Sequence, residues 1–194
     1  MRWYSIVSCD NAVTTPYVGD EGDLGEHEDA FGDCKPIEAW PGTAWVRASR
    51  TARDGDPDDV LQTCFFAPIY SRRLRGALEE AQISGIQYLP IRVLRRGGTE
   101  IPGFSVANVL NCADGLDVQS SEIERFPDDY FLPTRRGQIR SVNRAVLIGA
   151  VVDRYDILRL CSYPSQLYVS ERFVLLFEAN RFTGYSFREV PTSA

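Results

Sequence analysis

The sequence predicts an α+β domain, in which a mixed sheet packs against at least two helices. The main support is a repeat: residues 71–91 and residues 170–190 align without a gap. Each copy begins Ser-x-Arg-apolar, continues with apolar residues at helical spacing, and ends in a glycine followed by alternating apolar residues. A helix that runs into a strand has this pattern. Because short β-prone runs flank both copies, we expect a duplicated β-α-β element to organise the fold.

The first copy predicts strand, helix and strand in that order. Residues 65–70 are apolar and β-prone, and Pro68 restricts them to an edge or a bulge. Ser71 stands where a helix needs an N-cap. Gly85 follows the last apolar helical residue, as a left-handed glycine just after a helix does, and residues 86–93 form the exit strand. The helical face between them consists of Leu74, Ala77, Leu78 and Ala81.

The second copy repeats these features at Ser170, Gly184 and residues 185–190. Both serines are interpreted as helix caps and not as nucleophiles. Arg73 and Arg172 each precede a glutamate by six residues, a spacing that does not bring two side chains together on a helix. We therefore expect these arginines to pair with strands or loops around the helix ends.

Four further segments predict strands. Residues 2–7 and 104–110 alternate in polarity, and residues 156–160 are short and β-prone. Residues 145–152 form the longest apolar run, whose eight residues suit a buried strand. No apolar run approaches the roughly 20 residues that cross a membrane, and the first 13 residues lack the apolar region of a signal peptide.

The five cysteines are odd in number, far apart and without a CxxC pair. This pattern argues against a disulfide framework and against a zinc site, and it favours a reducing compartment. We therefore expect a cytoplasmic protein.

Three blocks of the chain, taken in order, carry a family resemblance. They are Ile69-Tyr70-Ser71 with Arg73-Leu74 and Gly85-x-x-Tyr88-x-Pro90-Ile91, then Val106-Ala107-Asn108-Val109-Leu110 with Leu116-Asp117 and Ser121, and finally Ser170-Glu171-Arg172 with Thr183-Gly184-Tyr185-Ser186-Phe187. Over about residues 64–190 the chain resembles family eleven of the immunity proteins of bacterial polymorphic toxin systems, formerly a domain of unknown function. The resemblance implies a non-enzymatic protein that binds and neutralises a cognate toxin encoded nearby. It supplies no catalytic residues and no cofactor.

Residues 1–60 carry no motif of that family, and we expect them to pack on, or loop from, a domain formed by residues 61–194. They hold 13 acidic and 5 basic residues, a net charge of −8, so the rest of the chain contributes +2 to the total of −6. Residues 20–33 hold seven carboxylates and no Lys or Arg, without the oxygen spacing of an EF-hand.

Two interpretations of this acidic segment stay open. It contacts a basic cleft of the toxin in place of phosphates, where complementary fields speed association, or it is a hydrated loop that keeps the protein soluble. Two tryptophans that bracket Pro41-Gly42 belong either to the same interface or to the edge of a core. The candidate toxin-binding residues are Asp20, Glu21, Asp23, Glu26, Glu28, Asp29, Asp33, Trp40 and Trp45.

Other functions are considered beside toxin binding. His27 is the only histidine, so any mechanism with a histidine base depends on it, and the common catalytic and nucleotide-binding motifs do not occur. The enzymatic alternative is a metal-dependent hydrolase assembled from scattered carboxylates. A second alternative is a small-ligand-binding module with a pocket between the two repeat units. Nucleic acid is an unfavourable partner for an acidic chain, and the oligomeric state is not predicted.

Overall fold

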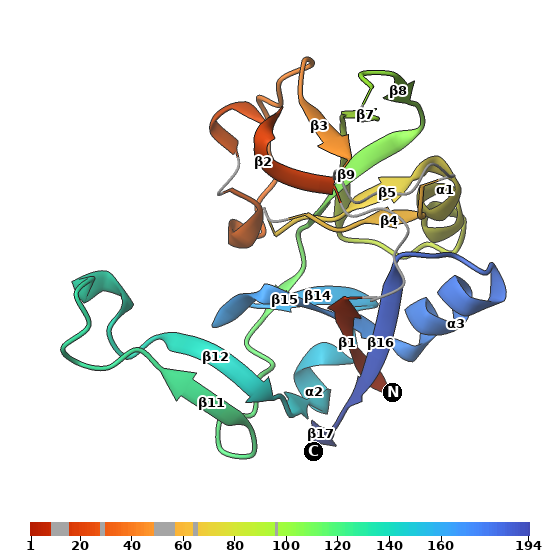
Figure 1. The fold of residues 1–194 in the computed structure, drawn as a ribbon. Helices are drawn as coiled ribbons and strands as arrows, with labels where there is room; N and C mark the ends of the chain where they lie inside the picture. The colour runs from red at the N-terminus through yellow and green to blue at the C-terminus, as the bar shows by residue number, and fades with distance from the viewer. Residues whose placement is uncertain (9–15, 28–29, 49–56, 64–65, 96) are drawn as a thin grey trace.

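The computed structural model describes residues 1–8, 16–27, 30–48, 57–63, 66–95 and 97–194. They form two halves stacked one above the other, with a β-hairpin that projects from the lower half (Figure 1). Parallel and antiparallel strand pairs occur in the same sheets, and helices pack beside them. The α+β class with a mixed sheet is therefore confirmed.

The lower half is built around the N-terminal strand, β1 (Trp3–Ser8). This strand lies between β15 (Tyr163–Ser170) and β16 (Tyr185–Val190) and is antiparallel to both. The sheet continues through β14 (Ile157–Leu160) to β10 (Cys112–Ala113), which is parallel to β14. The strands expected at the two ends of the chain and before the second repeat copy are confirmed.

Two four-stranded sheets form the upper half, in the orders β4-β5-β9-β6 and β2-β3-β7-β8. The first is antiparallel throughout, and the second contains one parallel pair, β3 with β7. In both halves a third strand separates the two strands that flank a repeat helix: β9 between β5 and β6, and β1 between β15 and β16. The bounds are β2 (Pro16–Asp23), β3 (Trp45–Ala48), β4 (Val60–Leu61), β5 (Ile69–Ser71), β6 (Ile86–Pro90), β7 (Arg92–Leu94), β8 (Glu100–Ile101) and β9 (Phe104–Val109).

Shorter elements complete the described chain. The projecting hairpin pairs β11 with β12, and β13 pairs in parallel with the last strand, β17. In the part of the chain that the structure describes, no helix has the length and apolar character to cross a membrane. These elements are η1 (Gly25–His27), η2 (Ala30–Asp33), β11 (Glu122–Arg125), η3 (Pro133–Arg135), β12 (Ile139–Arg144), β13 (Leu147–Ile148), α2 (Gly149–Val152) and β17 (Thr192–Ser193).

The two repeat helices, α1 (Arg72–Glu80) and α3 (Glu171–Ala179), begin in the same way. The Oγ of Ser71 accepts a hydrogen bond from the backbone N–H three residues on at 3.1 Å, and the Oγ of Ser170 does so at 3.3 Å. Both residues have extended backbone, as N-caps do. The predicted caps are therefore confirmed.

Neither helix ends at its predicted glycine. The left-handed residue that follows α1 is Gln82, with φ 56°, and Ile83 N donates to Leu78 O at 2.9 Å. This is a Schellman motif, in which the apolar residue after the turn packs back on the helix. The equivalent residues of α3 are Arg181, Phe182 and Phe177. Gly85 and Gly184 are also left-handed, but each lies three residues further on, where the exit strand begins.

Three predicted strands are wrong in extent. The run at residues 145–152 divides, because the chain turns into α2 at Gly149, where an added Cβ would lie 3.2 Å from Ser193 O of β17. The first exit strand also divides at Pro90, since proline has no N–H to continue a ladder: β6 and β7 belong to different sheets. β5 starts only after Pro68.

The described residues form three apolar core clusters, one in each half and one between them. The shared cluster contains the buried faces of both repeat helices and the strands beside them. It includes Leu74, Leu78, Phe173 and Phe177. The two halves are therefore joined by one continuous apolar interior.

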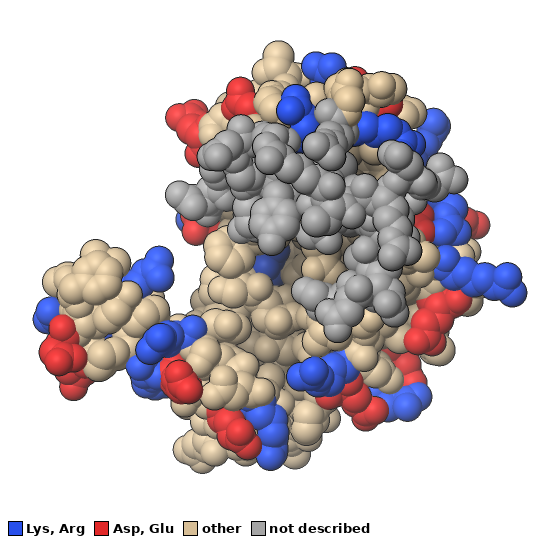
Figure 2. Space-filling model, in the orientation of Figure 1, with Lys and Arg blue, Asp and Glu red and all other residues tan. Residues whose placement is uncertain are grey.

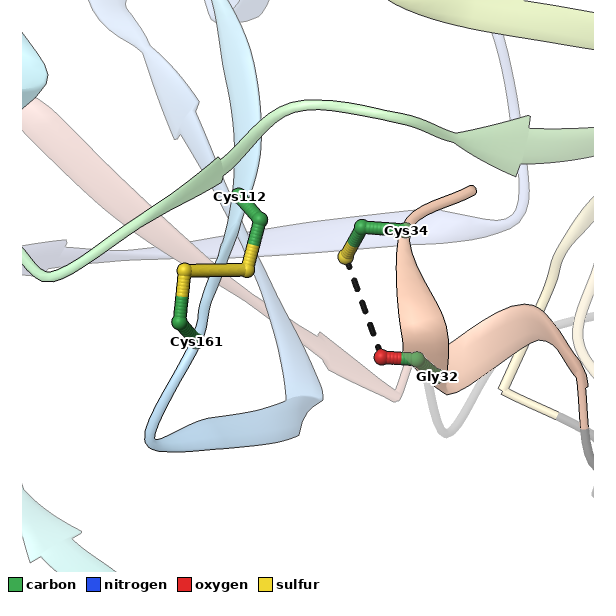
Figure 3. Close-up of a disulfide and its surroundings, with 4 residues drawn as sticks. All are labelled: Gly32, Cys34, Cys112 and Cys161. Atoms are coloured by element: carbon green, nitrogen blue, oxygen red, sulfur yellow. Dashed lines mark hydrogen bonds between the residues drawn. A yellow bond between two sulfur atoms is a disulfide. The ribbon is translucent and has the colours of Figure 1, made fainter. Parts of the chain in front are cut away.

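One disulfide, Cys112–Cys161, joins β10 to the residue after β14 (Figure 3). The two Cα atoms are 5.3 Å apart because β10 and β14 are neighbouring strands. The cysteine pattern argued against a disulfide framework and did not reveal this pairing, because a contact across 49 residues arises from the tertiary fold and leaves no local signal in the sequence. Cys34 is free and buried, and burial raises the pKa of its thiol. Cys9 and Cys64 lie outside the described residues.

Candidate functional site

The predicted acidic segment is only partly covered by the described residues. Asp23, Glu26 and Asp33 are exposed on β2, η1 and η2. One of them has a local role, because an oxygen of Asp23 accepts a hydrogen bond from Gly25 N at 2.8 Å. Glu28 and Asp29, and the side chains of Asp20 and Glu21 on β2, lie outside the described part.

The two tryptophans lie in different surroundings. Trp40 packs at the edge of the upper core, and its Nε1 donates to Pro90 O at 2.6 Å. Its ring contacts Phe31 edge-on, with centroids 5.9 Å apart. Trp45, on β3, is half-buried, and the guanidinium of Arg47 lies 5.5 Å from its ring centre. Trp40 thus packs at the core edge, and both tryptophans keep part of their surface exposed.

The repeat arginines pair with carboxylates outside their helices, as expected. Arg73 Nη2 lies 2.5 Å from Asp59 Oδ2, and Arg172 Nη1 lies 2.7 Å from Asp156 Oδ2. The same carboxylates accept hydrogen bonds from the hydroxyls of the two cap serines, at 2.8 and 2.7 Å. These residues fix the helix starts, and their role is structural. The sequence did not identify either aspartate.

The projecting hairpin, which we call the arm (residues 117–146), extends from the lower half, and its outer end stands clear of the rest of the molecule (Figure 2). Nearer its base, Ile123, Ile139 and Val142 pack against the lower apolar cluster. Its base is closed by a hydrogen bond from Asp117 N to Val146 O at 2.9 Å. Hydrogen bonds from Ser120 hold the pKa of the Asp117 carboxyl below its usual value. Its two strands carry a bulge at each end of their pairing.

The tip of the arm presents an aromatic cluster to solvent. Phe131 is 74% exposed, and Leu132 beside it is exposed as well. The ring of Tyr130 lies between its aromatic neighbours, with centroids 4.6 Å from Phe126 and 4.5 Å from Phe131. The tip (residues 126–138) has a net charge of zero, because it contains two acidic and two basic residues. Large exposed apolar residues grouped together are typical of interaction sites.

Hydrogen bonds within the tip hold this cluster in place. Phe126 N donates to Gln138 O, and Gly137 N to Phe126 O, both at 3.0 Å. Arg136 Nε donates to Tyr130 O at 2.8 Å. The aromatic rings are therefore presented on an ordered turn. Sequence reasoning missed this surface, although its signal is visible: three aromatic residues and a leucine stand between prolines and charged residues.

Titratable side chains do not gather into a metal-binding cluster in the described ranges. His27 Nε2 lies 2.9 Å from Ala39 O, and its ring is 5.8 Å from that of Trp40. This histidine therefore belongs to the packing around Trp40.

Comparison with known protein families identifies a match over nearly the whole chain. The model of the Immunity protein family (Imm11) matches residues 7–192. This range extends beyond the residues 64–190 that carry the motifs and takes in most of the acidic N-terminal third. No curated protein matches the sequence.

Proposed function

We propose that this chain, which belongs to the Immunity protein family (Imm11), binds a cognate toxin encoded nearby and neutralises it without catalysis. The family match over nearly the whole chain is the observation that carries the proposal. Direct binding needs an exposed and ordered surface, and the described residues offer two such surfaces.

The tip of the arm is the first proposed contact surface. Aromatic residues are enriched at the energetic centres of interfaces, because they bury a large area with few rotatable bonds. Phe131 and Tyr130 already lie on an ordered turn, so binding loses little conformational entropy. An arm that projects from the body can also enter a concave surface on a partner.

The acidic segment remains the second proposed surface. Asp23, Glu26 and Asp33 are exposed on β2, η1 and η2. Their charge would speed encounter with a basic cleft more than it would raise the final affinity. Trp45, with its half-buried ring, is included in this proposal, whereas the contacts of Trp40 favour the core-edge interpretation.

We also propose the cytoplasm as the place of action. Because the protein contains a disulfide, the cysteine pattern no longer supports a reducing compartment. The support for a cytoplasmic location is therefore the family assignment alone. Fractionation of the producing cells, with the protein detected by antibody, tests this location.

Co-expression with the neighbouring gene tests the function. If that gene product arrests growth alone, this protein should restore growth and co-purify with it. Phe131→Ala should weaken the purified complex roughly 30-fold or more, as loss of a hot-spot residue does. Leu175→Ala is the matched control, because Leu175 is an exposed apolar residue on α3. A harmless neighbour that does not co-purify contradicts the proposed function, whereas a complex insensitive to Phe131→Ala contradicts only the arm.

The acidic surface is tested separately by association kinetics. The variant Asp23→Asn/Glu26→Gln/Asp33→Asn should associate about 10-fold more slowly at low salt, with a smaller change at high salt. The control variant, Glu80→Gln/Asp114→Asn/Glu178→Gln, removes three exposed carboxylates elsewhere. Equal rates for the two variants would exclude a role for these acidic residues.

A further inference from the structure

A cavity of about 280 Å³ lies between the two halves of the fold. Its upper wall comes from residues on either side of the gap at 64–65, namely Thr63 on one side and Phe66 to Pro68 on the other. Its lower wall comes from β1, β14, β15 and β16, including Arg159, Ser165 and Leu167. The volume is near the lower limit of small-molecule sites, which span roughly 300–1,000 Å³.

Arg159 is the unusual member of this lining. The residue is only 1% exposed, although arginine is seldom buried without a partner. Its Nη1 donates to Pro164 O at 2.5 Å, and its Nη2 donates to Phe66 O. Its Nε is buried without a hydrogen-bond partner. A guanidinium has five N–H donors, so these two bonds leave most of its donor capacity unused.

Within the described ranges, the charge of Arg159 is also without a carboxylate partner. Its hydrogen bonds go to backbone carbonyls, and no carboxylate among the described residues pairs with it. Burial lowers the pKa of Arg159, but arginine stays protonated in proteins. A buried cation is strongly unfavourable unless an opposite charge or hydrogen bonds compensate it. An anionic ligand would supply that compensation.

The rest of the lining defines the kind of anion. Ser165 is exposed and makes no side-chain hydrogen bond within the described protein, so its hydroxyl is available to donate. Phe66 and Leu167 give the cavity an apolar side. One guanidinium balances one negative charge, so a carboxylate suits the site better than a doubly charged phosphate. An apolar group on the ligand would match the apolar side.

We propose that this cavity binds a small organic carboxylate, which pairs with Arg159 and lays its apolar part against Phe66 and Leu167. The site draws on both halves, and ligand binding therefore stabilises their contact. It is independent of the proposed toxin binding and can be tested on the isolated protein. Toxin binding can fail while the carboxylate site stands, and the reverse also holds.

Thermal unfolding with benzoate tests this proposal. At about 100 times its Kd, benzoate should raise Tm by roughly 5–10 °C. Benzyl alcohol, which keeps the ring without the charge, and phosphate should give no comparable rise at the same ionic strength. No rise with benzoate, or an equal rise with phosphate or benzyl alcohol, overturns the proposal.

Two variants connect the response to the cavity. Arg159→Met keeps much of the side-chain volume and should abolish the rise, whereas the matched control Arg140→Met, at an exposed arginine, should keep it. A full response in Arg159→Met overturns the proposal. If that variant does not fold, Ser165→Glu tests the proposal instead. It places a carboxylate in the cavity lining at an exposed position, where it competes with the ligand for Arg159. Loss of the response supports the site, and an unchanged response overturns it.

Discussion

Arg172, in the first turn of α3, donates a hydrogen bond from Nη2 to the backbone carbonyl of Ala81, the C-cap residue of α1. The reciprocal contact runs from Arg73 Nη1, in the first turn of α1, to Asn180 O at the end of α3, at 2.9 Å. A cation at a helix C-terminus is favourable, because the last carbonyls carry partial negative charge. The two helices are thus joined at both ends by the same chemistry. This explains why Ser-x-Arg occurs in both copies of the repeat.

Asp59 pairs with one of these arginines, Arg73. We expect that removal of the Asp59 carboxylate destabilises the fold. Asp59→Ala should lower the free energy of unfolding by about 2–3 kcal/mol, because buried donors lose their acceptor. These donors are the Ser71 hydroxyl, the Thr183 backbone N–H and part of the Arg73 guanidinium. The Arg73 side chain is 56% exposed, so its ion pair contributes only a small part.

Asp156→Ala is the matched comparison in the second copy. The Asp156 side chain is 18% exposed, against 10% for Asp59, and no backbone N–H donates to it in the described contacts. We expect a loss of about 1–2 kcal/mol. Urea denaturation measures both values. A larger loss for Asp156→Ala than for Asp59→Ala would show that the backbone amide is unimportant.

Replacing the left-handed residue after α1 should stabilise the protein. Gln82 has φ 56°, a conformation that costs a residue with a Cβ about 1 kcal/mol relative to glycine. Gln82→Gly should therefore raise the free energy of unfolding by about that amount, or Tm by roughly 2–4 °C. Gln82→Ala keeps the Cβ and should show no gain. Equal effects of the two substitutions would contradict the backbone explanation.

Alanine substitutions at Gly184 and Gly137 separate two effects on stability, namely backbone strain and steric crowding by neighbouring atoms. Both have positive φ, +101° and +72°. A Cβ on Gly184 would lie 2.3 Å from Val60 O, whereas a Cβ on Gly137 would have no atom within 4 Å. Gly137→Ala should cost about 1 kcal/mol, the strain alone. Gly184→Ala should cost more than about 3 kcal/mol, because backbone must shift as well. Similar losses in a denaturation experiment would refute the close approach of the two halves here.

The helix starts could be predicted because a cap is local: Ser71 and its hydrogen-bond partner are three residues apart. The helix ends were placed wrongly, because a Schellman turn accepts Gln82 when the next apolar residue packs back. Gly85 is required for a tertiary reason: a Cβ there would meet the side chain of Asn111 at 2.1 Å. The need for glycine at this position depends on a residue that is distant in the sequence, so the local sequence does not reveal it.

The partners of the repeat arginines escaped prediction for a related reason. Asp59 lies 12 residues before Ser71, but Asp156 lies 14 before Ser170, so the two aspartates do not align at the offset of the repeat. A bulge between β14 and β15 lies within the longer connection. The arm was not predicted because apolar residues in a sequence are usually assigned to the core, whereas the aromatic residues of the arm are exposed. The duplication as a structural unit and the division at residue 60 stay predictions.

Alkaline pH should destabilise the fold through the buried pair of Tyr70 and Tyr185. Their hydroxyls are 3.1 Å apart, and burial raises the pKa of both phenols above the usual value. In the unfolded chain a phenol ionises near pH 10, while the folded protein keeps these protons. The folded state therefore binds more protons above about pH 10, and the free energy of unfolding falls as pH rises, with no change below about pH 9. Each such tyrosine contributes a slope of about 1.4 kcal/mol per pH unit.

Tyr70→Phe should reduce the slope of the free energy of unfolding against pH in the alkaline range by the contribution of one tyrosine. At pH 7 the same variant should lose about 1 kcal/mol, because the hydrogen bond to Tyr185 is gone. The free energies of unfolding of wild type and Tyr70→Phe should thus converge as pH rises from 10 to 11, since only the wild-type chain has an ionising phenol at this position in the unfolded state. Urea titrations at a series of pH values measure the convergence. Parallel curves for wild type and Tyr70→Phe would show that this phenol keeps an ordinary pKa in the folded protein.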